Sequence, residues 1–327
     1  MLRKQIGFIL LILFAVCLTS CSESSKSSTS SIKRESSSFS ETSKSSLEES
    51  IRESSSNLES SSVNSEPSSS SESSSKEEGI SLASGIYNLA WSDEFDYEGS
   101  LDDTKWGYDL GSENGGWGNN ERQYYTNRLD NVSVDNGQLT IKAKKESYNG
   151  YQYTSARIVT KNKADFTYGY FEVKAKLPYG IGTWPAIWLL PTDNVYGGWP
   201  NSGEIDMMEM VGSRPNHVLG SIHTRDYNWY NGITVSKGGS TDVDTGITGF
   251  NTYGIEWTED YISFYVNGES YYTFANNNSG DYKQWPFDQD FHLILNIAMG
   301  GTLGGTISST FVESSMVVDY VRVYKLK

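Results

Sequence analysis

Residues 203–210 read Gly-Glu-Ile-Asp-Met-Met-Glu-Met, an apolar run that holds three carboxylates, Glu204, Asp206 and Glu209. Pro-Asn-Ser precedes the run and Gly-Ser follows it closely, and no 3.6-residue period continues through it. These features predict a strand rather than a helix. Side chains alternate faces along a strand, so Glu204 and Asp206 share one face and Glu209 should point to the other. A β-bulge at Met207-Met208, which inserts one residue, would return Glu209 to their face.

Three carboxylates on one strand face form a candidate site for acid–base chemistry. With the bulge, Glu204 and Glu209 are about four strand steps apart, roughly 13 Å between Cα atoms, so their carboxyl groups can approach to about 5–6 Å. This separation is typical of retaining glycosidases. Repulsion from Asp206 between them favours one protonated and one ionised carboxyl near neutral pH. The alternative, a solvated acidic face, explains one carboxylate better than three beside a Trp-rich segment.

The Trp-rich segment at residues 182–191 reads GTWPAIWLLP, and GGWP follows at 197–200. Trp184 and Trp188 are four residues apart, so on a strand they share a face, where their indole rings could stack on sugar rings. A place in the core is an equal alternative for Trp188, because Trp in a β-sandwich is often buried. Trp199 lies in a Gly- and Pro-rich loop just before the acids and is the better stacking candidate.

Short alternating segments predict strands through residues 80–327. Apolar and polar residues alternate at 139–144 and again at 171–177. Asn-Gly pairs at 136–137 and 267–268 are signals for hairpin turns. No convincing amphipathic helix interrupts the series, so we expect one all-β domain, an antiparallel two-sheet β-sandwich or jelly roll.

Residues 1–21 predict a lipoprotein export signal. Arg3-Lys4 form a basic start, residues 6–18 are apolar but short for a membrane span, and Leu-Thr-Ser-Cys ends the segment at Cys21. This ending resembles a bacterial lipobox, in which the Cys becomes the lipidated first residue of the mature protein. An ordinary secretory signal with a chance Cys and a retained helical anchor are the alternatives. Cys17 would be removed with the signal, which leaves Cys21 without a disulfide partner in the chain.

Residues 22–79 are rich in Ser, with scattered Glu and Lys and without Trp or Tyr. Such a segment cannot bury enough apolar surface to fold, so we expect a disordered linker with a reach of roughly 40 Å. The formal net charge of the chain is −15; the signal contributes +2 and the linker −5, which leaves −12 for residues 80–327. An acidic domain is poorly suited to nucleic acid, an anionic membrane surface or a strongly sulfated polymer.

Residues 85–327 resemble glycoside hydrolase family 16, in its laminarinase-like branch of endo-β-1,3-glucanases. Residues 204–209 are similar to the family motif E-x-D-x-x-E, including the extra residue that lichenase-type relatives lack. The supporting segments are WSDEF at 91–95, NNE at 119–121, YYT at 124–126, SAR at 155–157, WPAIW at 184–188, NIAMGG at 296–301 and VDYVRVY at 318–324. The resemblance implies a β-jelly roll of concanavalin-like shape with a groove across its concave sheet.

The resemblance also implies roles for single residues. Glu204 would be the nucleophile, Glu209 the general acid/base and Asp206 the residue that tunes them, and catalysis would need no cofactor. The implied substrate-binding residues of the groove are Asn120, Arg157, Trp184, Trp188, Trp199 and His223.

Members of the family often bind a structural calcium ion opposite the groove. The matching positions here are Glu94, Gly137 and Asp319, and some of their contacts would be backbone carbonyls. Tyr170 stands where many relatives have Arg, which puts one local sugar contact in doubt.

We therefore expect an extracellular, surface-tethered enzyme, a monomeric lipoprotein that hydrolyses laminarin-type β-1,3-glucan, with mixed-linkage β-1,3-1,4-glucan as a further substrate. Its partners would be the polysaccharide and, only through a lipid on Cys21, a bacterial membrane. The alternatives are a non-hydrolytic β-glucan-binding surface lipoprotein and a related family 16 galactanase. Intact Glu204 and Glu209 weigh against the first, and the domain charge weighs against sulfated galactans.

Overall fold

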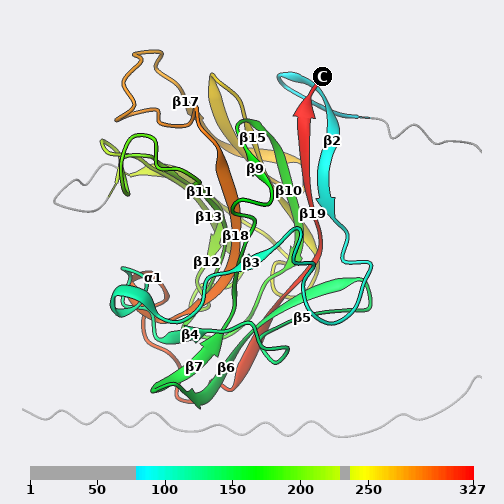
Figure 1. The fold of residues 1–327 in the computed structure, drawn as a ribbon, viewed down its shortest axis with the longest axis vertical. Helices are drawn as coiled ribbons and strands as arrows, with labels where there is room; N and C mark the ends of the chain where they lie inside the picture. Colours follow the sequence, from blue (N-terminus) through cyan, green and yellow to red (C-terminus); the bar gives the residue numbers. More distant parts are fainter. Residues whose placement is uncertain (1–78, 229–235) are drawn as a thin grey trace, which may run out of the picture. The chain divides into compact units, whose positions relative to one another are not determined.

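The computed structural model describes residues 79–228 and 236–327, and two β-sheets account for most of them (Figure 1). The predicted export signal, Cys21 and the predicted linker up to residue 78 lie outside the described residues. The helices in the described part are the 3-10 turn η1 (Glu113–Gly115) and the short α1 (Gly301–Gly304). No helix among these residues is long and apolar enough to cross a membrane.

The larger sheet contains eleven strands within the described residues. Its continuous order is β17-β16-β15-β10-β19-β6-β7-β4, while β2 also pairs with β19, β1 with β2 and β5 with β6. The bounds are β1 (Ile80–Leu82), β2 (Gly85–Asp93), β4 (Gln123–Tyr125), β5 (Val132–Asp135), β6 (Gln138–Tyr148), β7 (Tyr151–Ser155), β10 (Gly169–Lys176), β15 (Asn251–Trp257), β16 (Tyr261–Val266), β17 (Glu269–Ala275) and β19 (Glu313–Leu326).

The smaller sheet contains eight strands in the same described residues. Its order is β14-β13-β12-β11-β18-β8-β3, and β9 also pairs with β18. The bounds are β3 (Gly107–Tyr108), β8 (Arg157–Val159), β9 (Asp165–Phe166), β11 (Thr183–Pro191), β12 (Glu204–Met210), β13 (His217–His223), β14 (Lys237–Asp242) and β18 (Phe291–Met299).

One large apolar cluster joins residues from both sheets. Leu139 and Ile141 of β6 and Ile187 and Leu189 of β11 belong to it and are fully buried. Because alternate residues of each strand enter this cluster, the other face of each sheet is left for different contacts. The pairings between described strands are antiparallel except for β4 with β7. The predicted two-sheet antiparallel sandwich is confirmed, with that one parallel pair as an addition.

Strand β12 contains the predicted bulge. Asp206 lies opposite Ser221 of β13 and Glu209 lies opposite Leu219, so three steps along β12 match two along β13. The extra residue lies at Met207-Met208, and both of these side chains are buried in the core. The bulge prediction is confirmed. It interrupts the strict alternation that would turn Glu209 to the opposite face, so the three acids share a face.

Both predicted Asn-Gly turns form hairpins. Asn136 and Gly137 have φ of 54° and 71° between β5 and β6, and Asn267 and Gly268 have φ of 51° and 80° between β16 and β17. Positive φ at both central residues is the type I′ geometry, which matches the twist of the flanking strands. These turns fix the register of the two hairpins.

Tyr170 in β10 does not lie on the groove side. Phe171, the next residue, enters the main core, whereas Tyr170 packs against Tyr87 and Tyr324 on the other face of the larger sheet. Its hydroxyl donates to Glu172 at 2.8 Å. Strand alternation turns the ring of Tyr170 away from the smaller sheet, so this difference from the relatives lies outside the groove.

Candidate active site

A cavity of about 1230 Å³ lies over the smaller sheet, on the face opposite the core. Side chains of β11, β12 and β13 line it, together with residues of the loops around η1 and α1. Trp184 and Trp188 are both half-buried and both line this cavity. This geometry decides against a core position for Trp188. Trp199, which is 41% exposed, lines the same cavity from the loop before β12.

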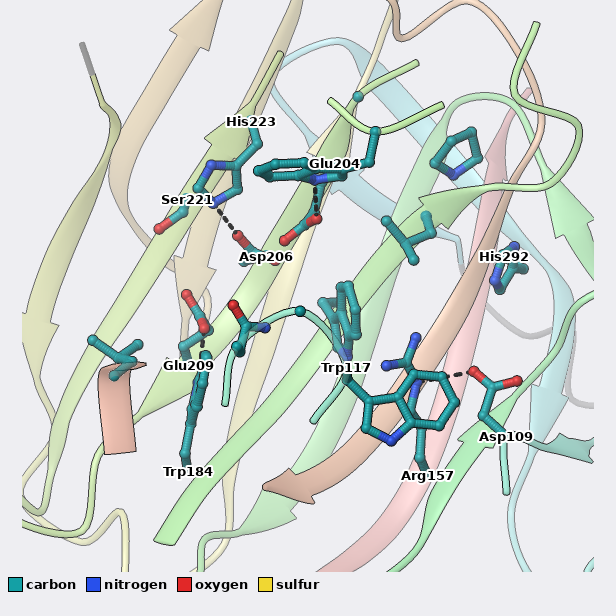
Figure 2. A pocket seen from close by; sticks show the side chains of 18 of the residues that line it. Asp109, Trp117, Arg157, Trp184, Glu204, Asp206, Glu209, Ser221, His223 and His292 are labelled. Carbon is teal, nitrogen blue, oxygen red and sulfur yellow. Dashed lines mark hydrogen bonds and ion pairs between the residues drawn. The ribbon is translucent and has the colours of Figure 1, made fainter. Parts of the chain in front are cut away.

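Each of the three acids meets a ring nitrogen (Figure 2). Trp199 Nε1 donates to Glu204 Oε2 at 2.6 Å, and Trp184 Nε1 donates to Glu209 Oε1 at 2.9 Å. His223 Nε2 lies 3.0 Å from Asp206 Oδ2, between the other two contacts. Within the described part of the chain, no Lys or Arg forms an ion pair with these acids. The carboxylates are therefore oriented without a fixed cation to neutralise them.

Burial and repulsion between neighbouring carboxylates change the protonation of Asp206 and Glu209. Burial raises the pKa of Asp206 well above its usual range, and the nearby charges of Glu204 and Glu209 raise it further. Burial also raises the pKa of Glu209, against the opposing effects of the Trp184 hydrogen bond and of His223. A carboxyl with a raised pKa keeps its proton closer to neutral pH, as a general acid requires.

Arg157 forms part of the groove wall and contacts two indole rings. Its guanidinium carbon lies 4.5 Å from the ring centroid of Trp117 and 4.8 Å from that of Trp188. Its Nε lies 2.9 Å from Asp109 Oδ2 (Figure 2). Two cation–π contacts and an ion pair restrict the orientation of the guanidinium. Arg157 is only 8% exposed.

Sequence reasoning missed Trp117 and Asp109. Trp117 lies in a Gly-rich loop, which is the same signal that selected Trp199, and it could have been found in that way. Asp109 follows β3 and has no distinguishing neighbours in the sequence, so only the fold reveals its place beside Arg157.

The remaining predicted groove residues are His223 and Asn120. His223 lines the cavity as expected. Asn120 does not; its side chain is exposed, and the adjacent Asn119 lines the cavity in its place. Asn120 has a left-handed φ of 58° and directly precedes the buried Glu121.

The predicted calcium positions lie on the larger sheet, where β2 and β6 both pair with β19. Glu94 accepts hydrogen bonds from Arg322 at 2.9 and 2.7 Å, and Asp319 lies 2.9 Å from Lys174 Nζ. Both carboxylates are thus engaged by cations in this structure. Backbone carbonyls, including that of Gly137, would complete a site, and calcium at this place stays a prediction.

Another set of donors has metal-ligand spacing. Atoms of Glu204, Asp206 and His223 lie within 4.8 Å of one another, a grouping found among the described residues only in the groove. Glu204 and His223 are direct partners in the pairing of β12 with β13. The grouping therefore follows from strand register, and sequence spacing gave no sign of it.

Comparison with known proteins places these features in a family. Residues 119–322 match the family of glycosyl hydrolases family 16. Residues 2–202 also match the family of beta-glucan synthesis-associated proteins SKN1/KRE6/Sbg1, in a stretch that ends before Glu204.

Individual relatives agree with this match. The beta-glucanase of Rhodothermus marinus is 50% identical over 248 residues, which cover 73% of this chain and 85% of the relative. The X-ray structure of the laminarinase from Rhodothermus marinus superposes with a TM-score of 0.69 at 51% identity, covering 73% of this chain and 97% of that one. A non-specific endo-β-1,3(4)-glucanase of family GH16, co-crystallised with 1,3-β-D-cellotriosyl-glucose, gives a TM-score of 0.71 at 42% identity, covering 76% and 98%. The chain therefore belongs to glycosyl hydrolase family 16.

Proposed function

We propose that this glycoside hydrolase cuts internal bonds of β-1,3-glucan and retains the anomeric configuration. The observation that supports this best is the common face of Glu204, Asp206 and Glu209, produced by the bulge and directed into a groove. Relatives at 50% and 42% identity that are described as β-glucanases favour the same substrate class. Mixed-linkage β-1,3-1,4-glucan is proposed as a second substrate.

In the first step, a carboxylate oxygen of Glu204 forms a bond to the anomeric carbon while the bond from that carbon to the leaving sugar oxygen breaks. Glu209 donates its proton to the departing oxygen. The electron pair of the broken bond stays on that oxygen, and a covalent glycosyl ester remains on Glu204. The raised pKa of Glu209 suits this donation because the group keeps its proton at higher pH.

In the second step, Glu209 is ionised and accepts a proton from water. The water oxygen attacks the anomeric carbon, and Glu204 leaves as a carboxylate. Asp206 supports both steps through its place between the two glutamates on β12 and its contact with His223. The pKa values of Asp206 and Glu209 are both raised, so the pH dependence of the reaction reflects both carboxyl groups.

The groove residues are proposed to hold the glucan chain. Trp184, Trp188 and Trp199 present indole rings, and Arg157 presents a guanidinium fixed by Asp109. Such rings stack on the apolar faces of sugars, while fixed donors bind hydroxyl groups. A groove open to solvent admits the middle of a polymer, which favours endo-acting cleavage.

A direct test uses residues 79–327 with laminarin, mixed-linkage glucan and agarose, and follows reducing ends and the anomer formed first. We expect release from laminarin and an initial β-anomer. Binding without release from any polymer would favour the non-hydrolytic glucan-binding alternative, and release only from agarose would favour a galactanase. An initial α-anomer would contradict the retaining mechanism.

We also propose that the enzyme is tethered at the cell surface through a lipid on Cys21. The proposal depends on the lipobox-like sequence and the Ser-rich linker, which lie outside the described residues. Full-length protein produced in a bacterial host should partition with membranes and incorporate a labelled fatty acid, and Cys21→Ser should incorporate none. Equal incorporation of the label in both forms would contradict lipid anchoring at this residue.

A further inference from the structure

A chain of buried hydrogen bonds leads from Glu121 to the groove. Tyr125 Oη donates to Glu121 Oε2 at 3.2 Å, Asn296 Nδ2 donates to Tyr125 Oη at 3.1 Å, and Trp188 Nε1 donates to Asn296 Oδ1 at 2.8 Å. Tyr125 is fully buried, and Glu121 and Asn296 are 8% and 6% exposed. The first two links join buried residues, where a hydrogen bond restricts geometry strongly, and the last link reaches the half-buried Trp188 in the groove.

The Glu121 end of this series of hydrogen bonds is connected to the backbone of the smaller sheet. Gln123 Nε2 donates to Glu121 Oε2 at 2.5 Å, and Gln123 Oε1 accepts a hydrogen bond from the backbone N–H of Met299 at 2.7 Å. Glu121 and Gly300 also form an isolated β-bridge. The carboxylate of Glu121 therefore has a fixed position relative to β18.

The other end of this series of hydrogen bonds, at Asn296 and Trp188, positions part of the groove wall. Asn296 is the direct partner of Arg157 in the pairing of β18 with β8. The Trp188 indole, held by Asn296, makes one of the two cation–π contacts of the Arg157 guanidinium. A rotation of Trp188 would therefore displace both an indole face and a cation on the wall.

We propose that Glu121, Tyr125 and Asn296 form a positioning relay that sets the orientation of Trp188 and, through it, of Arg157. None of the three is a catalytic residue in this proposal, since the relay acts on substrate only through Trp188 and Arg157. The consequence for catalysis rests on the proposed β-glucanase function. Disrupting the relay should weaken binding of the glucan chain while the acids of β12 stay in place.

The fold offers a matched control for this relay. Tyr87 in β2 is 1% exposed, and its hydroxyl donates to Oε1 of the buried Glu256 at 3.2 Å. The Tyr125 hydroxyl donates to Glu121 over the same distance. Tyr87→Phe and Tyr125→Phe thus remove the same chemical group from similar surroundings, one on the outer face of the larger sheet and one beneath the groove.

The experiment compares both variants with the unsubstituted protein in laminarin hydrolysis. Tyr125→Phe should raise KM about three- to tenfold and leave kcat within about twofold, because it removes binding that is equal in ground and transition states. When Tyr125→Phe is combined with the inactive Glu204→Gln, the Kd for a β-1,3-gluco-oligosaccharide should rise by the same factor relative to Glu204→Gln alone. Tyr87→Phe should lose thermal stability and keep both constants.

The relay proposal would be overturned if KM and Kd were unchanged in Tyr125→Phe. It would also be overturned if KM and Kd rose equally in Tyr125→Phe and Tyr87→Phe. If Tyr125→Phe does not fold, Glu121→Gln provides the same readout, because the amide keeps the size of the carboxylate and loses one acceptor. Absence of hydrolysis in the unsubstituted protein would reject the proposed function instead, and the Kd comparison would still test the relay.

Discussion

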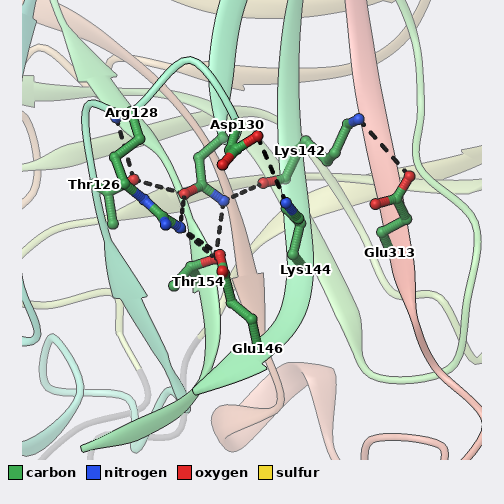
Figure 3. A network of polar contacts seen from close by, with 9 residues as sticks. Thr126, Arg128, Asp130, Lys142, Lys144, Glu146, Thr154 and Glu313 are labelled. Atoms are coloured by element: carbon green, nitrogen blue, oxygen red, sulfur yellow. Dashed lines mark hydrogen bonds and ion pairs between the residues drawn. The ribbon is translucent and has the colours of Figure 1, made fainter. Parts of the chain in front are cut away.

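The three acids of β12 in the groove and the carboxylates of the polar network beside β6 lie in contrasting surroundings, because among the described residues only those of the network have an Arg or Lys partner. In the network, Glu146 of β6 meets Arg128 and Thr154, and Asn131 joins Thr126 and Thr154 (Figure 3). Burial works to raise the pKa of Glu146, but the bonds from Arg128 and Thr154 outweigh it and the pKa is lowered.

In the groove, Asp206 and Glu209 have raised pKa values because burial is not balanced by a Lys or Arg partner in the described residues. A carboxylate therefore stabilises the fold in the network, whereas in the groove carboxyl groups keep a proton that they can transfer. The difference lies in whether a permanent cation is within reach, and this makes the two regions separable by mutation.

The largest expected effect is on turnover in the groove. Glu204→Gln should lower kcat on laminarin by about 10⁴-fold or more, because the amide cannot form the glycosyl ester, while Kd for the glucan stays nearly constant. Reducing-end assays and calorimetric titration measure the two quantities. Azide added to Glu204→Gly should restore bond cleavage. Turnover close to the original value in Glu204→Gln would remove it as nucleophile.

Glu209→Gln should lower kcat on laminarin by about 10²- to 10⁴-fold, because the leaving sugar oxygen then receives no proton. On an aryl β-glycoside of a short β-1,3-glucan, whose leaving group needs no proton, the kcat of the variant should fall much less. Glu146→Gln is the control from the network, and its kcat should be unchanged. An equal loss on both substrates would contradict the acid role of Glu209.

The pH profile should show the raised pKa of the acid. Glu209 must be protonated to donate, so kcat/KM should fall as pH rises through its pKa, above the ordinary range for Glu. The Trp184 hydrogen bond opposes this increase, so Trp184→Phe should move the alkaline limb to higher pH. An unmoved or lowered limb would show that this bond does not tune the acid.

The smallest expected effect is on stability, and its sign should differ between the two regions. The raised pKa of Asp206 means that its charged form destabilises the fold, so stability falls as pH rises through the folded-state pKa. The lowered pKa of Glu146 stabilises the fold above the pKa of the unfolded chain, and this contribution is lost as pH falls through the folded-state pKa.

Asp206→Asn should therefore raise the unfolding free energy at pH 7 by on the order of 1 kcal/mol, whereas Glu146→Gln should lower it by about 1 kcal/mol. Thermal melts at pH 7 and at pH 4 measure both differences, and the difference for Asp206→Asn should disappear in acid. The same sign for both variants at pH 7 would contradict the comparison.

Much of the candidate site could be predicted because its signals are local. Strand alternation, the turn residues around 203–210 and the spacing of the three acids were sufficient to require a bulge at Met207-Met208, which the register of β12 confirms. The four-residue spacing of Trp184 and Trp188 likewise placed both on one face. Such patterns depend only on backbone geometry, which neighbouring residues determine.

The partners of those residues depend on tertiary structure. The pairs Asp109 with Arg157, Trp188 with Asn296 and Glu94 with Arg322 join residues that are 48, 108 and 228 positions apart. No local pattern encodes these contacts, because they arise from the order and register of strands that are not consecutive. The sequence by itself thus determined the sandwich, the bulged acidic strand and its chemistry. Only the folded sheets decided which acids remain without a cation, since that depends on which distant side chains reach them.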